Sequence, residues 1–231
     1  MNKKVGIVIT TFNDCEEFSK MFLELVECDG VDLQNVVVVD GSTDEQEKEN
    51  IKQACKDAGI RLLGWRKHLT QALNTGSLAL IGKEYNCDYV LWVHNDMRFK
   101  DHKDWIVNLV QFAEESPHVG KCAPRNWNLE NADAPDSPGN TCPTLLKQEV
   151  IEKIFDKYGE LYDENYWGAC CWDDDDLNRK VYSVHKEVWI TGKSRVWHKG
   201  MGTRGNFVRS EWEAHNAMHH FKKWGENKMV V

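Results

Sequence analysis

Residues 5–10 read Val-Gly-Ile-Val-Ile-Thr, and this short apolar run decides the class of fold. A continuous run rich in β-branched side chains is typical of a strand buried on both faces of a parallel sheet. Residues 11–14 form a turn signal, and the segment after it has apolar residues at three- and four-residue spacing. This apolar stripe consists of Phe18, Met21, Phe22, Leu25 and Val26. The chain therefore begins with a strand that leads into an amphipathic helix.

The same alternation of strand and helix continues along the chain. Further strands are predicted at 36–39, 60–65, 88–94 and 119–123, with helices at about 42–58 and 70–85 and one that begins near Trp105. For the helix after residue 41, Ser42 with Glu45, or Thr43 with Gln46, fits a capping box. Alternating strands and helices predict an α/β fold with a doubly wound, mostly parallel central sheet flanked by helices.

The C-terminal part departs from this alternation. Residues 124–143 are rich in Asn, Asp, Pro and Gly, which indicates a long surface loop. Helices are predicted at about 150–158 and 207–224, with one or two strands at 188–197. Without a clear linker, we expect a single domain over residues 1–231.

Composition narrows the classes of protein. With 231 residues and 41% hydrophobic content, the chain can bury a sizeable core. A net charge of −8 disfavours a protein that coats nucleic acid, although it leaves a local basic patch possible. The eight cysteines are scattered without zinc-site spacing, which indicates a reducing compartment. With no apolar run near ~20 residues, we expect a cytoplasmic protein without a membrane span.

An acidic stretch, Asp173–Asp176, stands between Trp172 and Leu177. Four adjacent carboxylates repel one another, so each must be solvated, protonated or paired with a cation. One interpretation is an acidic turn that opens a helix, where negative charge is stabilised by the helix dipole. The other is a site that binds a cation or moves a proton. The residues alone leave both open.

Several short motifs occur in an order that resembles the family 2 glycosyltransferases of the GT-A fold. The resemblance covers nearly the whole chain and rests on Val-Ile-Thr-Thr-Phe-Asn (8–13), Val-Val-Val-Asp-Gly-Ser-Thr-Asp (37–44), Leu-Asn-Thr-Gly (73–76), Val-His-Asn-Asp (93–96), Leu-Tyr-Asp-Glu-Asn-Tyr-Trp (161–167), Asp-Asp-Asp-Asp-Leu-Asn-Arg (173–179) and Val-Trp-His (196–198). It implies a metal-dependent, inverting transfer of a sugar from a nucleotide-diphosphate donor, with UDP the expected nucleotide, to a hydroxyl acceptor. A glycan is the expected acceptor, and nucleic acid is not an expected partner.

The resemblance also implies which residues bind the donor. The candidates are Thr11, Asn13, Asp40, Asn74, Asp96 and Arg204. Asp40 would accept a hydrogen bond from a pyrimidine N–H. Two structural alternatives stay open: Asn13 caps the following helix, or Asp40 only makes an Asx-turn.

A metal, Mn²⁺ or Mg²⁺, is expected to neutralise the diphosphate of the donor. The resemblance assigns it to Asp96 and His198, while His94 stands where the family motif has its first acidic residue. Imidazole together with a carboxylate suits Mn²⁺. A histidine bonded to a backbone carbonyl is the structural alternative for His198.

On the acceptor side, the resemblance implies that Asp174 is the general base. Asp173, Trp172 and Trp127 are expected to contact sugar, whereas Asp176 and Arg179 are expected on the helix surface. Residues 200–205 spell G-x-G-x-x-G, but too little chain follows for a dinucleotide-binding unit. We interpret them as a glycine-rich lid with Arg204 against phosphate, or else as an inert loop.

These assignments divide the domain into a donor-binding half, 1–123, and an acceptor-binding and catalytic half, 124–231. Two other functions stay open. One is a non-catalytic nucleotide- or carbohydrate-binding module of the same fold. The other, less favoured, is a sugar-phosphate nucleotidyltransferase, because residues 11–14 are neither glycine-rich nor basic.

Overall fold

The computed structural model describes residues 3–99, 101–126, 135–139, 142–168, 172–198 and 209–225. Trp127, Arg204 and the whole glycine-rich stretch 200–205 lie outside these residues. The acceptor contact, the phosphate contact and the lid predicted there are therefore not described by the structure.

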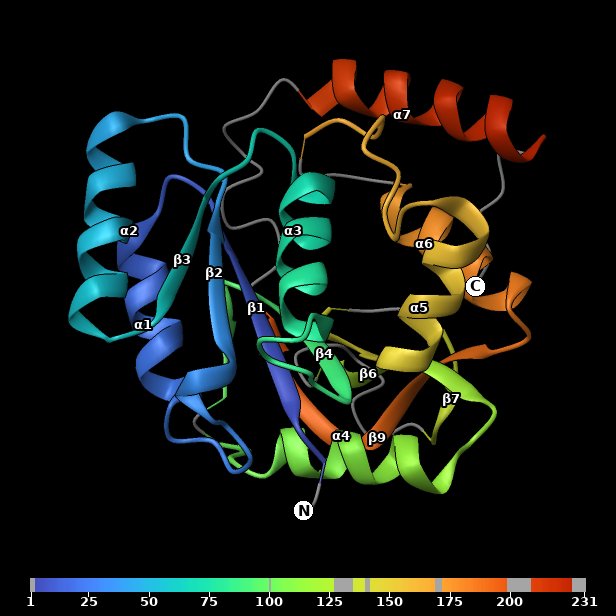
Figure 1. Ribbon diagram of the computed structural model, residues 1–231, viewed down its shortest axis with the longest axis horizontal. Helices are drawn as coiled ribbons and strands as arrows, with labels where there is room; N and C mark the ends of the chain where they lie inside the picture. Colours follow the sequence, from blue (N-terminus) through green and yellow to red (C-terminus); the bar gives the residue numbers. More distant parts are fainter. Residues whose placement is uncertain are drawn as a thin grey trace.

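The described residues form a central sheet with helices on both faces (Figure 1). The strands are β1 (Val5–Thr11), β2 (Val36–Asp40), β3 (Arg61–Trp65), β4 (Tyr89–His94), β5 (Met97–Arg98), β6 (Val119–Asn126), β7 (Ser137–Pro138), β8 (Thr144–Lys147) and β9 (Glu187–His198). The helices are α1 (Cys15–Leu25), α2 (Glu45–Asp57), α3 (Leu69–Ile81), α4 (Trp105–Glu115), α5 (Gln148–Tyr158), α6 (Asp173–Ser183) and α7 (Arg209–Trp224), with a 3₁₀ turn at η1 (Leu33–Asn35). The α/β class predicted from the sequence is confirmed.

The strand order is β3-β2-β1-β4-β8-β6-β9-β5, and β7 pairs with β9. Strands β1 to β4 pair in parallel, as expected for strands joined through helices. β8 runs antiparallel to both of its neighbours, while β6 and β9 are parallel. The sheet is thus parallel in its N-terminal half and mixed in its C-terminal half, where the described residues between β6 and β8 form strand β7 and no helix.

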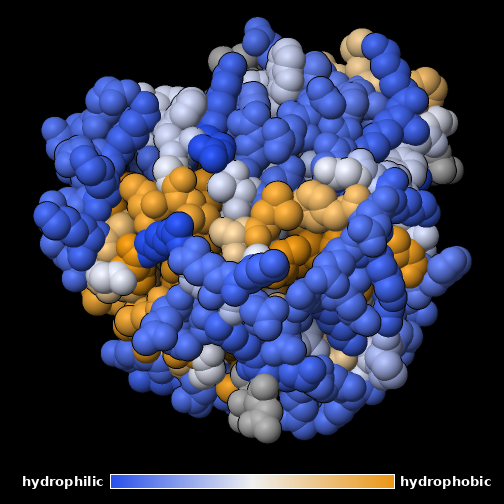
Figure 2. All heavy atoms as spheres, viewed as in Figure 1, coloured by the Kyte–Doolittle hydropathy of each residue, from blue (hydrophilic) through white to orange (hydrophobic). Residues whose placement is uncertain are grey.

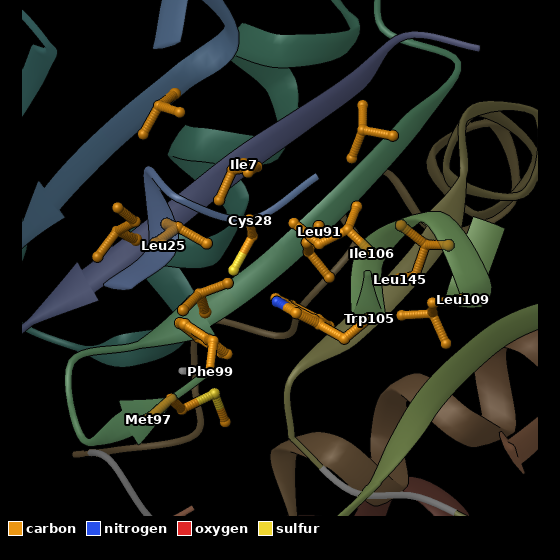
Figure 3. Close-up of a cluster of buried hydrophobic side chains, with 14 of the residues drawn as sticks. Ile7, Leu25, Cys28, Leu91, Met97, Phe99, Trp105, Ile106, Leu109 and Leu145 are labelled. Carbon is orange, nitrogen blue, oxygen red and sulfur yellow. The ribbon is translucent and has the colours of Figure 1, made fainter. Parts of the chain in front are cut away.

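Two apolar cores lie on opposite faces of the sheet. The first contains buried side chains of α1, α2 and α4, and Figure 3 shows ten of its residues by name, with Trp105 and Leu109 of α4 facing Leu91 and Leu145 of the sheet. The second contains residues of α3, α5 and α6. Helix α3 packs closely against β1 at Gly76, where an added Cβ would stand only 2.5 Å from Val8 Cγ1. The absence of a side chain on Gly76 permits this close packing.

Several local predictions differ from the structure. Helix α2 is capped by Asp44, whose side chain accepts a hydrogen bond from the Glu47 N–H at 2.9 Å, so the predicted capping boxes are wrong. Val26 follows α1 and is 37% exposed, since the helix ends one residue earlier. The segment 124–126 belongs to β6, so the predicted loop begins later than expected.

Figure 2 shows the face of the molecule that carries α3, where hydrophilic residues predominate and a hydrophobic band crosses the middle. In the described part of the chain, every helix is too short or too polar to cross a membrane.

Candidate active site

The carboxyl ends of β1 and β2 hold a buried carboxylate, Asp40. Thr11 lies beside it in the parallel register and donates its hydroxyl to Asp40 Oδ1 at 2.8 Å. The backbone N–H and the hydroxyl of Ser42 donate to the same oxygen at 3.1 and 2.7 Å. The Asx-turn considered for Asp40 is therefore present. Asp40 Oδ2 accepts no hydrogen bond from the residues that the structure describes, which leaves that oxygen available to a ligand.

Asn13 holds the turn between β2 and α2. Its amide oxygen accepts from the backbone N–H groups of Thr43 and Asp44 at 2.8 and 3.1 Å, and its amide nitrogen donates to the Thr43 hydroxyl at 2.9 Å. Helix α1 is capped by Asp14 instead, which accepts from the Glu17 N–H at 3.0 Å. The alternative in which Asn13 caps the helix is wrong. Asn13 joins the two loops that border Asp40.

Asp96 and His198 meet at the end of β4. Asp96 lies in the turn between β4 and β5, and the antiparallel register of β5 and β9 sets Met97 opposite His198. His198 Nε2 stands 3.1 Å from Asp96 Oδ1, although the two residues are 102 positions apart. Because β4 is hydrogen-bonded to β1, this pair lies at the same sheet edge as Thr11 and Asp40.

The electrostatics of Asp96 suit a ligand for a cation. Burial raises the pKa of Asp96, but the hydrogen bond with His198 and the charges of His198 and His94 outweigh it and lower the pKa to about 2. The His94 ring lies 6.4 Å from that of His198, centroid to centroid. Among the described residues, no three His, Cys, Asp or Glu side chains are arranged to bind a metal. Asp96 and His198 supply one oxygen and one nitrogen donor, which fits a metal whose remaining ligands come from a substrate.

The four aspartates at the start of α6 have different environments. Asp174 is exposed, whereas Asp173, Asp175 and Asp176 are buried. Asp175 Oδ2 lies 3.0 Å from Arg179 Nε and 2.9 Å from His220 Nε2. Asp176 lies 3.1 Å from Lys180 Nζ and 2.8 Å from Lys223 Nζ. Asp176 and Arg179 were expected on the helix surface; this is wrong for Asp176, whose side chain is fully buried.

The acidic stretch opens helix α6, as the first interpretation predicts. Asp175 and Asp176 are paired with cations inside the protein, which offsets the cost of burying them. Asp174 stands exposed in the first turn of α6, and its role as a base stays a prediction. Trp172 caps this helix with a φ of 75°, and its ring packs against that of His220 at 4.9 Å.

Helix α7 holds the segment that precedes the acidic stretch, a function that sequence reasoning missed. Buried Asn216 accepts from the Trp167 N–H at 2.8 Å and donates to the Trp167 carbonyl at 3.0 Å. His219 Nε2 and Lys223 Nζ contact Asp163 Oδ2 at 2.8 and 2.7 Å. The available signal was the cluster of Asn, His and Lys along one face of the predicted helix.

Asn74, which was expected to bind the donor, forms hydrogen bonds within the protein. Its amide oxygen accepts from the Tyr162 N–H at 2.8 Å, and its amide nitrogen donates to the Tyr162 carbonyl at 2.8 Å and to Glu164 at 3.1 Å. These bonds tie α3 to the segment after α5 and leave little capacity for a ligand.

Lys121 is a second residue that sequence reasoning missed. It lies fully buried on β6 and donates to Asn178 Oδ1 at 2.8 Å. Burial lowers the pKa of Lys121, and Asp174 is the strongest of the charges that oppose this shift. The start of α6 therefore has a buried amine beneath it.

Comparisons with known proteins identify the family and the fold. The model of the family described as glycosyl transferase family 2 matches residues 6–163. Among curated proteins, no sequence matches the chain.

Solved structures share the fold. A mannosyltransferase, PcManGT from Pyrobaculum calidifontis in complex with GDP-Man and Mn²⁺, is 18% identical with a TM-score of 0.66, over 100% of this chain and 66% of that one. GalNAc-T7 with UDP, GalNAc and Mn²⁺ is 12% identical with a TM-score of 0.62, over 85% and 43%. TarS of S. aureus is 12% identical with a TM-score of 0.60, over 96% and 44%.

This chain thus spans about two thirds or less of the length of these structures. At these identities the likeness concerns the fold. The family model covers well over half of the sequence and includes β2, which ends at Asp40, and the turn after β4 that contains Asp96. The chain belongs to glycosyl transferase family 2.

Proposed function

We propose that this protein is a metal-dependent, inverting glycosyltransferase that moves a sugar from a nucleotide-diphosphate donor, with UDP as the nucleotide, to a hydroxyl of a glycan acceptor. The observation that carries the proposal is the contact between Asp96 and His198 at the carboxyl edge of the sheet. In open α/β sheets, ligands bind beyond this edge. Two titratable side chains from distant parts of the sequence meet there, at the same sheet edge as Asp40.

Each half of the chain has a part in this reaction. In the donor-binding half, 1–123, Asp40 accepts an N–H of the nucleobase, while Thr11 and Asn13 hold the loops around it. Asp96 and His198 would hold Mn²⁺ or Mg²⁺, which supplies Lewis-acid stabilisation of the departing diphosphate. Structures of the same fold with bound Mn²⁺ support a divalent metal.

The acceptor-binding half, 124–231, supplies the base. Asp174 accepts the proton of the acceptor hydroxyl while the hydroxyl oxygen attacks the anomeric carbon of the donor sugar. The attack comes from the side opposite to the departing nucleoside diphosphate, so one displacement inverts the anomeric configuration. The exposure of Asp174, next to three buried aspartates, supports this assignment.

The test is calorimetric titration of UDP, GDP and dTDP into the protein, with Mn²⁺ and then with a chelator. We expect UDP to bind in the presence of Mn²⁺ and at least about tenfold more weakly without it, since a metal held by Asp96 and His198 would neutralise the charge of the diphosphate. Asp96→Asn should abolish the metal dependence. Asp57→Asn is the control, because Asp57 is an exposed residue at the end of α2.

Failure of all three nucleotides to bind to folded protein would contradict the proposal. Binding without turnover of any sugar nucleotide would instead favour the non-catalytic binding module.

A further inference from the structure

Trp65 is an exposed aromatic residue beside the predicted donor site. It ends β3 and is 43% exposed, whereas Trp92 and Trp105 are buried in the core. The parallel pairing of β2 and β3 sets Asp40 opposite Trp65. Because neighbouring strands lie about 4.8 Å apart, Trp65 follows directly beside Asp40 along the sheet edge.

The indole of Trp65 is held in place. Its N–H donates to the Ser42 carbonyl, in the turn that follows Asp40. The ammonium of Lys48 lies 5.1 Å from the ring centroid, within range of a cation–π contact. A fixed ring binds a planar ligand at a lower entropic cost than a mobile one.

The backbone around Asp40 also brings a second aromatic residue, Phe12, close to Gly41. The Arg66 N–H donates to the Asp40 carbonyl at 2.7 Å, which closes the end of β3 against β2. A Cβ added at Gly41 would stand 3.3 Å from the Arg66 carbonyl oxygen and 3.4 Å from Phe12 Cδ2. Phe12 and the end of β3 therefore lie close to Gly41, the residue that follows Asp40.

We infer that Trp65 is a nucleobase-binding residue of the donor site, on whose ring the nucleobase stacks while Asp40 accepts a base N–H. The inference rests on the proposed function. It explains why a large aromatic side chain is kept exposed and oriented at this edge of the sheet. Base–aromatic stacking tolerates any base, so the hydrogen bond to Asp40 has to make the selection.

The bonding of Asp40 favours one class of base. Thr11 and Ser42 occupy Oδ1, and only Oδ2 is open to a ligand from among the described residues. Guanine presents two adjacent N–H groups, which match a carboxylate with both oxygens free. Uracil presents one ring N–H between two carbonyl groups. The single open oxygen therefore fits a uridine nucleotide better than a guanosine nucleotide.

Calorimetric titration of UDP and GDP, with Mn²⁺ present, tests this inference on the wild type, Trp65→Leu and Trp65→Phe. Loss of stacking should weaken UDP binding at least about tenfold in Trp65→Leu, while Trp65→Phe retains most of the affinity. Trp189→Leu is the matched control, since the indole of Trp189 also donates to a nearby oxygen, Glu187 Oε2, at 2.7 Å on the distant strand β9. It should bind UDP within about twofold of the wild type, because it removes no group near Asp40.

A second measurement uses the unmodified protein and so does not depend on the folding of a variant. Saturating UDP should protect Trp65 from N-bromosuccinimide oxidation, measured by peptide mass spectrometry. Trp167 is 44% exposed and serves as the internal reference, whose oxidation should not change.

UDP binding by Trp65→Leu within twofold of the wild type, or unprotected Trp65, would overturn the role of Trp65. Tighter binding of GDP than of UDP by the wild type would overturn the selection by Asp40. The first result leaves the proposed function standing, whereas the second would leave the glycosyltransferase reaction standing and replace UDP as its nucleotide. A wild type that binds neither nucleotide would overturn the proposed function and this inference with it.

Discussion

At the scale of single residues, neighbouring carboxylates of the same type serve different purposes. Asp176 is fully buried and contacts Lys180 and Lys223, while Asp174, two positions earlier, is exposed. A buried carboxylate needs cationic partners to remain ionised, so Asp176 is committed to the interior. An exposed carboxylate remains free to accept a proton. Side-chain direction around the first turn of α6 separates these two uses.

Asp174→Asn tests the assignment of the base. The amide keeps the size of the side chain but cannot accept the acceptor proton, so sugar transfer should fall about 10²- to 10⁴-fold. Nucleotide affinity, measured by calorimetry, should stay unchanged. Turnover is followed as release of the nucleoside diphosphate from the sugar nucleotide.

The matched control is Asp156→Asn, at an exposed position of α5, which should keep full turnover. Transfer that survives in Asp174→Asn would show that another group takes the proton.

Asn13 tests the connection between the two donor-site loops. Asn13→Ala removes three hydrogen bonds of the Asn13 side chain. The alanine must also adopt the left-handed backbone φ of 45° found at this position, which asparagine adopts more readily than alanine. The free energy of unfolding should fall by about 2 kcal/mol, from the lost bonds and the strained backbone. Urea denaturation measures this change.

Asn13→Gly separates the two causes, because glycine adopts this φ freely but lacks the amide. We expect its stability to lie between those of the wild type and Asn13→Ala. If Asn13→Ala were as stable as the wild type, the hydrogen bonds by which Asn13 joins the two loops would not stabilise the fold.

At the scale of elements, α7 fastens the segment that leads to the acidic stretch. Its residues bond the backbone of Trp167, the hydroxyl of Tyr166 and the carboxylate of Asp163. Figure 1 shows α7 lying across α6 and α3 at the top of the molecule. The segment before Asp174 is thus held by a helix that comes later in the chain, after β9.

The Asp163 contact makes the docking of α7 dependent on pH. Burial raises the pKa of Asp163, but hydrogen bonds from Lys223, His219 and the Asn165 N–H outweigh it and hold the pKa below its usual range. Because its pKa is lowered in the folded protein, the Asp163 carboxylate contributes its full stabilisation at pH values above the pKa of Asp in the unfolded chain, about 3.9. The contribution is lost as the pH falls below that value towards the pKa of Asp163 in the folded protein.

Asp163→Asn should therefore lower the free energy of unfolding at pH 7 by about 3 kcal/mol, because it leaves Lys223 without one of its anions. The difference from the wild type should shrink as the pH falls from 4 towards 2, which urea denaturation at several pH values measures. Asp101→Asn, at an exposed position, should show no such change. A difference that stays constant with pH would contradict the ionic contribution of Asp163.

At the scale of the whole molecule, the two cores enclose most of the described cysteines as free thiols. Cys28, Cys55 and Cys122 lie in one core and Cys87 in the other. Burial raises the pKa of Cys28 and Cys87 to about 11, and that of Cys55 and Cys122 to about 12. The thiolate is the reactive form, so packing makes these groups inert.

Iodoacetamide at pH 8 should leave these four cysteines unmodified in the native protein and label them quickly in urea. Mass spectrometry of the alkylated peptides measures both rates. Native labelling of Cys55 at the urea rate would show that the cores open readily.

The sequence by itself determined the alternation of strands and helices, the class of fold and the positions of Asp40, Asp96, Asp174 and His198 in family motifs. It succeeded because hydrophobic periodicity records which face of a local segment is buried. The assignment of a role to each of these residues stays a prediction.

The tertiary structure alone decided which distant groups meet. The pairing of β5 with β9 sets His198 beside Asp96, and the docking of α7 buries Asp176 among cations. Asn74 was predicted to bind the donor, yet the segment after α5 uses its amide. Trp65 was expected only as part of a strand, and the register with β2 brings it beside Asp40. Periodicity does not record strand order or register, because those depend on contacts between residues far apart in the chain.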